Sequence, residues 1–81
     1  MYIRGDEINI KVDDILVKLD KIRTYYKDNV KDEFDGITVE FEDWWFNVRP
    51  SNTEPLLRVT VEAENGGELK KRQEEVMKVI Q

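Results

Sequence analysis

The sequence predicts an α+β domain in which two helices cover one face of a four-stranded, mainly antiparallel sheet, in the order βαβββα. Three observations lead to this prediction: four segments alternate apolar and polar residues, two segments place apolar residues at helical spacing, and turn residues separate them. A chain of 81 residues holds one domain, so residues 1–81 are expected to form a single unit. A sheet with helices on one side is the simplest way to bury these apolar stripes.

The first part of the chain predicts a strand followed by a helix. Ile8, Ile10 and Val12 alternate with polar neighbours, as in a half-buried strand. Asp13 is the expected N-cap of the helix, which we expect to end at Asp28-Asn29. The predicted buried face of this helix consists of Ile15, Leu16, Leu19, Ile22 and Tyr26.

A polar connector, residues 31–33, leads into a predicted β-hairpin. One face of its first strand is apolar, with Ile37, Val39 and Phe41. Glu42-Asp43 is the expected two-residue turn, so that Phe41 pairs with Trp44. In that register the buried face continues with Trp44, Phe46 and Val48, and the opposite face holds Trp45, Asn47 and Arg49.

A fourth strand and a second helix complete the predicted domain. Apolar residues at every second position predict the strand, with Leu57, Val59, Val61 and Ala63. Asn65-Gly66-Gly67 ends it. The helix is expected to run from Glu68 to Gln81, with a buried face of Leu69, Val76, Met77 and Ile80. The basic cluster Lys70-Lys71-Arg72 is expected to face solvent, because positive charge early in a helix opposes the helix dipole.

The composition excludes several classes of function. The chain has no Cys and no His, which excludes zinc fingers, thiol nucleophiles and His-based acid–base catalysis. The net charge of −5 disfavours nucleic acid as a partner. No segment approaches the ~20 apolar residues of a membrane span or resembles a signal peptide, so we expect no membrane partner and a cytoplasmic location. The strand carboxylates are expected to be solvated, and we predict no metal-binding residue and no catalytic residue.

The chemistry of the chain is concentrated in one loop, Arg49-Pro50-Ser51-Asn52-Thr53-Glu54-Pro55. Proline cannot donate to a sheet ladder, so the two prolines are expected to bracket a segment outside the sheet, where the backbone N–H groups of residues 51–54 lack ladder partners. The side chains of Ser51, Asn52 and Thr53 add hydrogen-bonding groups, and Arg49 adds a planar fork of donors that suits phosphate oxygens. The loop therefore predicts a phosphate site.

Two neighbouring residues have competing interpretations. Arg58 lies on a polar strand face near the loop and is a candidate to support the anion, although a solvated or ion-paired role is equally consistent. Trp45 is expected on the open face, against another domain of a longer protein in preference to a sugar ring. The loop itself is also ordinary turn chemistry. A protein-interaction or structural domain without a ligand is therefore the alternative function.

The loop and its flanks also resemble a known family. Arg49 to Arg58 (RPSNTEPLLR), preceded by Asp43-Trp44-Trp45-Phe46-Asn47, closely resembles the C-terminal, fourth domain of the α-D-phosphohexomutases, and most of all phosphomannomutase/phosphoglucomutase. The likeness extends through residues 36–39, residues 61–63 and residues 7–9, so it covers nearly the whole chain.

This resemblance implies a fold like that of the TATA-box-binding protein and a role in a longer enzyme. Such enzymes are intramolecular phosphotransferases (isomerases) that interconvert hexose 1-phosphate and hexose 6-phosphate and use magnesium. Their last domain grips the phosphate that is not transferred, and Arg49, Ser51, Asn52 and Thr53 match the phosphate-contact positions. The family's serine loop, metal loop and sugar-selecting loop have no counterpart in this sequence. The resemblance thus implies an excised C-terminal domain that is not catalytic alone, holds no cofactor, and has a phosphorylated hexose and other domains of the same parent chain as partners.

Overall fold

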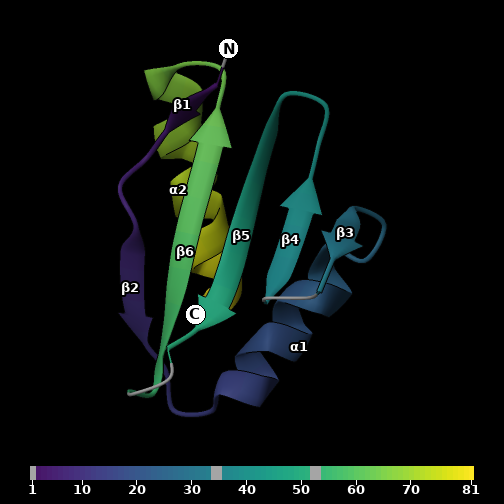
Figure 1. Cartoon of the computed structure of the whole chain (residues 1–81), viewed down its shortest axis with the longest axis vertical. Coiled ribbons are helices and arrows are strands. Elements are labelled where there is room, and N and C mark those ends of the chain that lie inside the picture. The colour runs from purple at the N-terminus through teal and green to yellow at the C-terminus, as the bar shows by residue number, and fades with distance from the viewer. Residues whose placement is uncertain (1, 34–35, 52–53) are drawn as a thin grey trace.

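The computed structural model describes residues 2–33, 36–51 and 54–81, which form one antiparallel sheet with two helices (Figure 1). The sheet order is β1-β6-β5-β4-β3, and β2 also pairs with β6. The strands are β1 (Ile3–Arg4), β2 (Ile8–Lys11), β3 (Val30–Asp32), β4 (Ile37–Glu40), β5 (Trp44–Pro50) and β6 (Leu56–Ala63). The helices are α1 (Ile15–Tyr25) and α2 (Gly66–Ile80). The α+β class, the antiparallel sheet and the four predicted strands are confirmed.

Two further strands, β1 and β3, extend the edges of the sheet and were not predicted from the sequence. β1 and β2 pair with opposite ends of β6, and the N–H of Gly5 between them donates to the carbonyl of Val61 at 2.9 Å. They are therefore two pieces of one interrupted edge. β3 forms within the predicted polar connector and pairs with β4. An edge strand needs hydrogen bonds on one side only, so a short polar segment can fill it without an apolar pattern.

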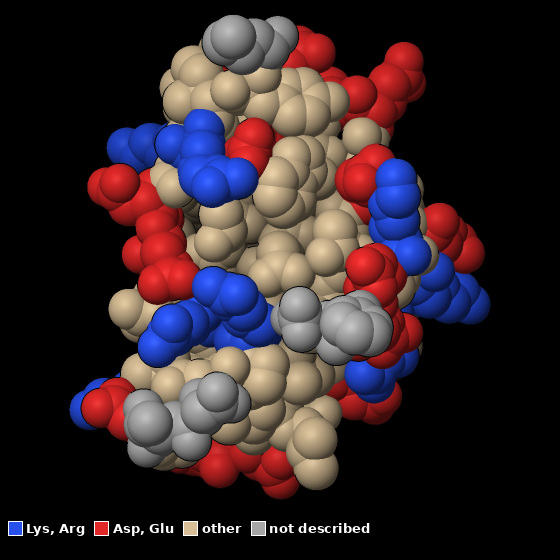
Figure 2. All heavy atoms as spheres, viewed as in Figure 1, with Lys and Arg blue, Asp and Glu red and all other residues tan. Residues whose placement is uncertain are grey.

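The β4–β5 hairpin has the predicted register. The N–H of Phe41 donates to the carbonyl of Trp44 at 2.8 Å, which leaves Glu42-Asp43 as the two-residue turn. Trp44, Phe46 and Val48 are buried, and Trp45 and Asn47 lie half-buried on the opposite face. In Figure 1, α2 lies behind β5 and β6, and the opposite face of the sheet points toward the viewer. Figure 2 shows this open face, where uncharged atoms occupy the middle between groups of Lys and Arg atoms.

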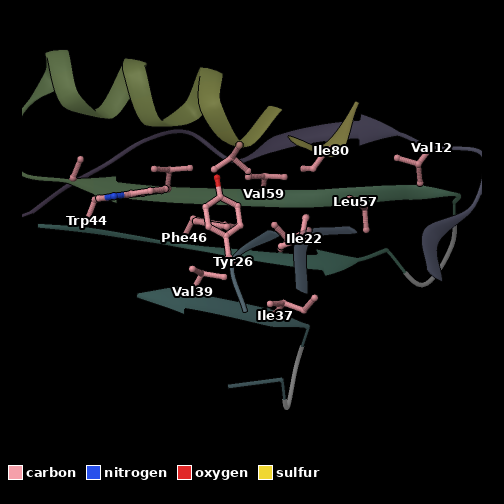
Figure 3. Packing of buried hydrophobic residues seen from close by; sticks show 14 residues of the cluster. Val12, Ile22, Tyr26, Ile37, Val39, Trp44, Phe46, Leu57, Val59 and Ile80 are labelled. Atoms are coloured by element: carbon pink, nitrogen blue, oxygen red, sulfur yellow. The ribbon is translucent and has the colours of Figure 1, made fainter. Parts of the chain in front are cut away.

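The core lies between the sheet and the helices. Figure 3 shows side chains of β4, β5 and β6 meeting Ile22 and Tyr26, with Ile80 above them. The fully buried members of this cluster include Ile22, Val39, Phe46, Val48, Leu57, Val61, Ala63 and Val76. Phe41, Trp44 and Phe46 form a stack with ring centroids 4.5 and 5.5 Å apart. None of the helices in the described part of the chain has the length and apolar character of a membrane span.

Four predicted details of the helices are wrong. α1 ends at Tyr25 and not at Asp28-Asn29, because the N–H of Tyr26 makes the last helical hydrogen bond, to the carbonyl of Ile22 at 3.0 Å. The N-cap of α1 is Asp14, not Asp13, because Asp14 keeps an extended backbone and its side chain accepts the N–H of Val17 at 3.2 Å. Leu16, predicted to be buried, is 77% exposed because it lies about 100° around the helix from Ile15 and off the stripe that meets the core. α2 begins at Gly66, since Asn65 caps it by accepting the N–H of Glu68 at 2.9 Å.

Arg72 also departs from its expected place in solvent. Its guanidinium lies over the ring of Trp44, 5.0 Å from the centroid, and forms ion pairs with Glu68 at 3.3 Å and Glu75 at 3.0 Å. Glu75 in turn accepts the hydroxyl of Tyr26 at 2.8 Å. The aliphatic part of an arginine side chain can pack on an apolar surface while its guanidinium stays paired. The prediction was wrong because it considered only the charge of Arg72. Lys70 and Lys71 are exposed, as expected.

Candidate functional site

The proline-bracketed loop joins β5 to β6, and its base is tied into the sheet. Pro50 is the last residue of β5 and pairs with Leu57. The N–H of Ser51 donates to the carbonyl of Leu56 at 3.0 Å. Residues along an antiparallel ladder alternate between hydrogen-bonded and non-hydrogen-bonded pairs, so the Pro50–Leu57 pair requires no N–H from the proline. The prediction that the segment leaves the sheet at Pro50, with the N–H of residue 51 unpaired, is therefore wrong.

The other end of the loop is tied to a different part of the sheet. The N–H of Leu56 donates to the carbonyl of Glu54 at 2.8 Å, and the carbonyl of Pro55 accepts the N–H of Val12 at 3.0 Å. Val12 follows β2 directly, so the loop contacts both the β5–β6 hairpin and the edge formed by β2. Asn52 and Thr53, two of the predicted phosphate-contact residues, lie outside the described residues.

Two arginines lie side by side next to this loop. Arg49 on β5 and Arg58 on β6 are direct cross-strand partners, so their side chains leave the sheet on the same, open face. Both residues are exposed. Like charges at directly opposite positions repel each other, and an anion between them would remove that penalty. The structure thus brings together Arg49, Ser51 and Arg58, three of the residues singled out in the sequence.

Glu7 is a neighbour of this pair that the sequence did not indicate. Its carboxylate lies 3.9 Å from a terminal nitrogen of Arg49, a loose ion pair between side chains that are 40% and 53% exposed. Asn9, two residues later, pairs with Arg58 across the β2–β6 ladder. Neither residue could be placed from the sequence, because the sheet order that brings β2 beside β6 was not determined by any local pattern.

The open face also carries a hollow beside Arg49. Its volume is about 390 Å³, and it is lined by Arg4, Asp32, Thr38, Trp45, Asn47, Arg49 and Thr60. Most of these side chains are uncharged. Among the described residues, no group of three or more carboxylate, His or Cys side chains is arranged to hold a metal ion. The face therefore offers two exposed guanidinium groups at one end, and next to them a hollow that combines neutral hydrogen-bonding side chains with the charged Arg4 and Asp32.

The fold and site together define an α+β domain with an open antiparallel sheet and a basic pair at the base of a proline-bracketed loop. The family model described as phosphoglucomutase/phosphomannomutase, C-terminal domain, matches residues 7–79. The chain belongs to this family, which confirms the resemblance seen in the sequence.

Relatives of known name support the same assignment. The chain is 42% identical over 79 residues to a phosphomannomutase of Methanocaldococcus jannaschii, covering 98% of this chain and 18% of that protein. It is 42% identical over 77 residues to a phosphomannomutase of Vibrio cholerae, covering 91% and 17%. A probable phosphoglucosamine mutase of Pyrococcus furiosus is 41% identical over 73 residues, covering 90% and 15%. The chain thus spans less than a fifth of the length of these relatives.

Proposed function

We propose that this chain is the substrate-phosphate-binding domain of a phosphomannomutase/phosphoglucomutase, an isomerase that interconverts hexose 1-phosphate and hexose 6-phosphate. The domain grips the phosphate that is not transferred and is not catalytic alone. The supporting observation is the pairing of Arg49 with Arg58 on the open face, beside Ser51 at the loop base. Asn52 and Thr53 complete the proposed contacts on the strength of the resemblance.

In this proposal, the guanidinium groups of Arg49 and Arg58 make the main contacts with the phosphate. The N–H of Ser51 is used inside the hairpin, so the backbone amide at that position does not supply the anion contact expected from the sequence. A hydrogen bond to a charged group contributes roughly 1.5–3 kcal/mol net, so two arginines can support binding in the millimolar range. Arginine suits this role because its planar fork matches two phosphate oxygens at once.

The remaining parts of the reaction belong, in this proposal, to the longer protein. Phosphoryl transfer and the magnesium ion would be handled by other domains of the same parent chain, since the described residues hold no group suited to that metal. We propose a phosphorylated hexose as the ligand and the cytoplasm as the location. We propose neither nucleic acid nor membrane as a partner, given the net charge of −5.

The proposal is tested by titrating the 81-residue chain with glucose 1-phosphate and mannose 6-phosphate while its amide NMR signals are followed. Shifts should concentrate on residues 49–58 at millimolar ligand. Arg49→Ala should weaken binding about tenfold or more, because a charge-assisted contact is lost. Lys70→Ala is the matched control, since it removes one positive charge from an exposed position on α2. Unchanged signals in residues 49–58 of the folded chain would contradict the proposal.

A protein-contact role is the second candidate, and one observation favours it. Leu16, Val17 and Tyr25 on α1 are 77%, 57% and 65% exposed. Val17 and Tyr25 line one shallow hollow on this helix, and an exposed apolar hollow is typical of a contact surface. The protein-contact surface lies on a helix, whereas the phosphate site lies on the open face of the sheet. Arg49→Ala therefore distinguishes the two roles. If the variant loses phosphate binding and keeps the contact made by the helix, the phosphate site lies at Arg49.

A further inference from the structure

We propose that the hollow on the open sheet face binds the hydroxylated ring of a phosphorylated sugar whose phosphate is held at Arg49. This inference rests on the proposed function and extends it, because it assigns this domain a share in recognising the sugar as well as the phosphate. The hollow and the basic pair are continuous, since Arg49 itself lines the hollow.

The positions of the lining residues follow from the strand register. Arg49, Asn47 and Trp45 lie on the same face of β5 at every second position, and their Cα atoms are spaced by about 7 Å per step. Across the ladder, Asn47 pairs with Thr60 and also with Thr38 on β4. A ligand that begins at Arg49 and extends along β5 thus meets hydroxyl and amide groups first, and an indole ring after them.

The chemistry of these side chains fits a sugar. Hydroxyl groups of a hexose both donate and accept hydrogen bonds, as do the side chains of Thr38, Asn47 and Thr60. Trp45 is half-buried, so part of its ring remains exposed at the hollow to pack against the C–H groups of a sugar face. The amide of Asn47 is already held in place, because it donates to the hydroxyl of Thr38 at 3.0 Å and to the carbonyl of Ile37 at 3.4 Å. Such preorganisation lowers the entropic cost of binding.

Three charged side chains line the hollow: Arg4, Arg49 and Asp32. The carboxylate of Asp32, the ladder partner of Thr38, disfavours a phosphate beside Thr38, so the choice lies between the two arginines. Arg4, at the far end, donates from Nε to Glu62 at 2.9 Å and has a second nitrogen 2.9 Å from the same carboxylate oxygen. The side chain of Arg4 is 67% exposed and that of Glu62 is 15% exposed, so Arg4 is open to solvent but already has a carboxylate in close contact. Among the described residues, the ion pair of Arg49 is the loose one with Glu7, at 3.9 Å. The anion is therefore expected at Arg49 and the ring toward Trp45, which gives the ligand one orientation.

The inference is tested by comparing inorganic phosphate with glucose 1-phosphate on the 81-residue chain by NMR titration, following the backbone amides and the indole N–H of Trp45. Glucose 1-phosphate should bind about fivefold more tightly than inorganic phosphate, because the ring adds hydrogen bonds and packing. Thr60→Val should reduce that preference and leave the affinity for inorganic phosphate unchanged. Thr24→Val is the matched control, since Thr24 is exposed on α1, away from the sheet face.

A second variant keeps the test independent of folding defects. Trp45→Ala should abolish the preference for the sugar phosphate, and Trp45→Phe, which retains a ring, should keep part of it. Circular dichroism establishes that each variant is folded. Equal affinities for the two probes, with an unchanged indole N–H signal of Trp45, would overturn the inference. The proposed function would still hold in that case. The result would favour a protein segment, in place of a sugar ring, as the group that packs on Trp45. Binding of neither probe would overturn both.

Discussion

At the scale of single residues, Gly36 controls the place of Arg49. It has φ +107°, a conformation that residues with a Cβ rarely adopt. A Cβ built there would meet the carbonyl oxygen of Val48, and would lie 2.7 Å from Cβ of Arg49. Backbone and Cβ atoms cannot rotate out of the way. The residue before β4 must therefore lack a Cβ, so that β5 can pass directly beside it.

Gly36→Ala is accordingly expected to destabilise the fold by about 2 kcal/mol or more, from the strained backbone and the clash with β5. Urea denaturation measures the change in the free energy of unfolding. Because the clash falls on Val48 and Arg49, phosphate binding should weaken as well. Gly66→Ala is the control: nothing lies within 4 Å of its added Cβ at the start of α2, so stability should stay the same or rise slightly. Equal effects of the two substitutions would contradict this account.

At the scale of secondary-structure elements, the N-terminus of α1 distinguishes two neighbouring aspartates. Asp14→Ala should lower the free energy of unfolding by about 1 kcal/mol, because the N–H of Val17 loses its acceptor. Asp13→Ala should change it little, since the side chain of Asp13 makes no cap. Thermal unfolding monitored by circular dichroism compares the two variants directly. A larger loss of stability in Asp13→Ala than in Asp14→Ala would contradict this assignment and support Asp13 as the N-cap.

The elements that the sequence predicted well are those with strong periodic patterns. β4, β5 and β6 have buried residues at every second position, and the register of β4 with β5 followed from a two-residue turn. β1 and β3 were missed because two or three residues show no period, and their strand conformation depends on a neighbouring edge. Leu16 was misplaced because a helical stripe leaves its two margins ambiguous when apolar residues are adjacent in sequence.

The sequence predicted part of the arrangement at the candidate site, and the role of its residues stays a prediction. Arg49, Ser51 and Arg58 do converge at one end of the sheet, which the alternation of β5 and β6 predicts. The partner of the Ser51 N–H could not be foreseen, because it depends on where the alternating ladder places Pro50. Glu7 and the hollow depend on the order of all the strands, which local patterns do not determine.

At the scale of the whole molecule, Tyr26 connects the two helices to the core. Burial, and after it the hydrogen bond to Glu75, raise the pKa of Tyr26 above its usual value near 10. The unfolded chain loses this proton near the usual value, whereas the folded chain keeps it. The contribution of Tyr26 to stability is therefore complete below about pH 10 and declines as the pH rises further.

Between about pH 8 and about pH 11, the free energy of unfolding should fall by about 1 kcal/mol more in the wild-type chain than in Tyr26→Phe. The variant is expected to be less stable at neutral pH, since it loses the bond to Glu75. Tyr25→Phe, at an exposed tyrosine next in the chain, provides the reference for all other groups that titrate at high pH. Identical pH profiles for Tyr26→Phe and Tyr25→Phe would contradict the assignment.

The two ends of the proline-bracketed loop are fastened to different strands, one through Ser51 and Leu56 and the other through Pro55 and Val12. These two ends are therefore part of the hydrogen-bonded sheet. A ligand that displaces these ends would also displace the sheet, and with it the two helices that pack on the sheet. Under the proposed function, a movement of these two ends toward a substrate would therefore require the sheet to move with them.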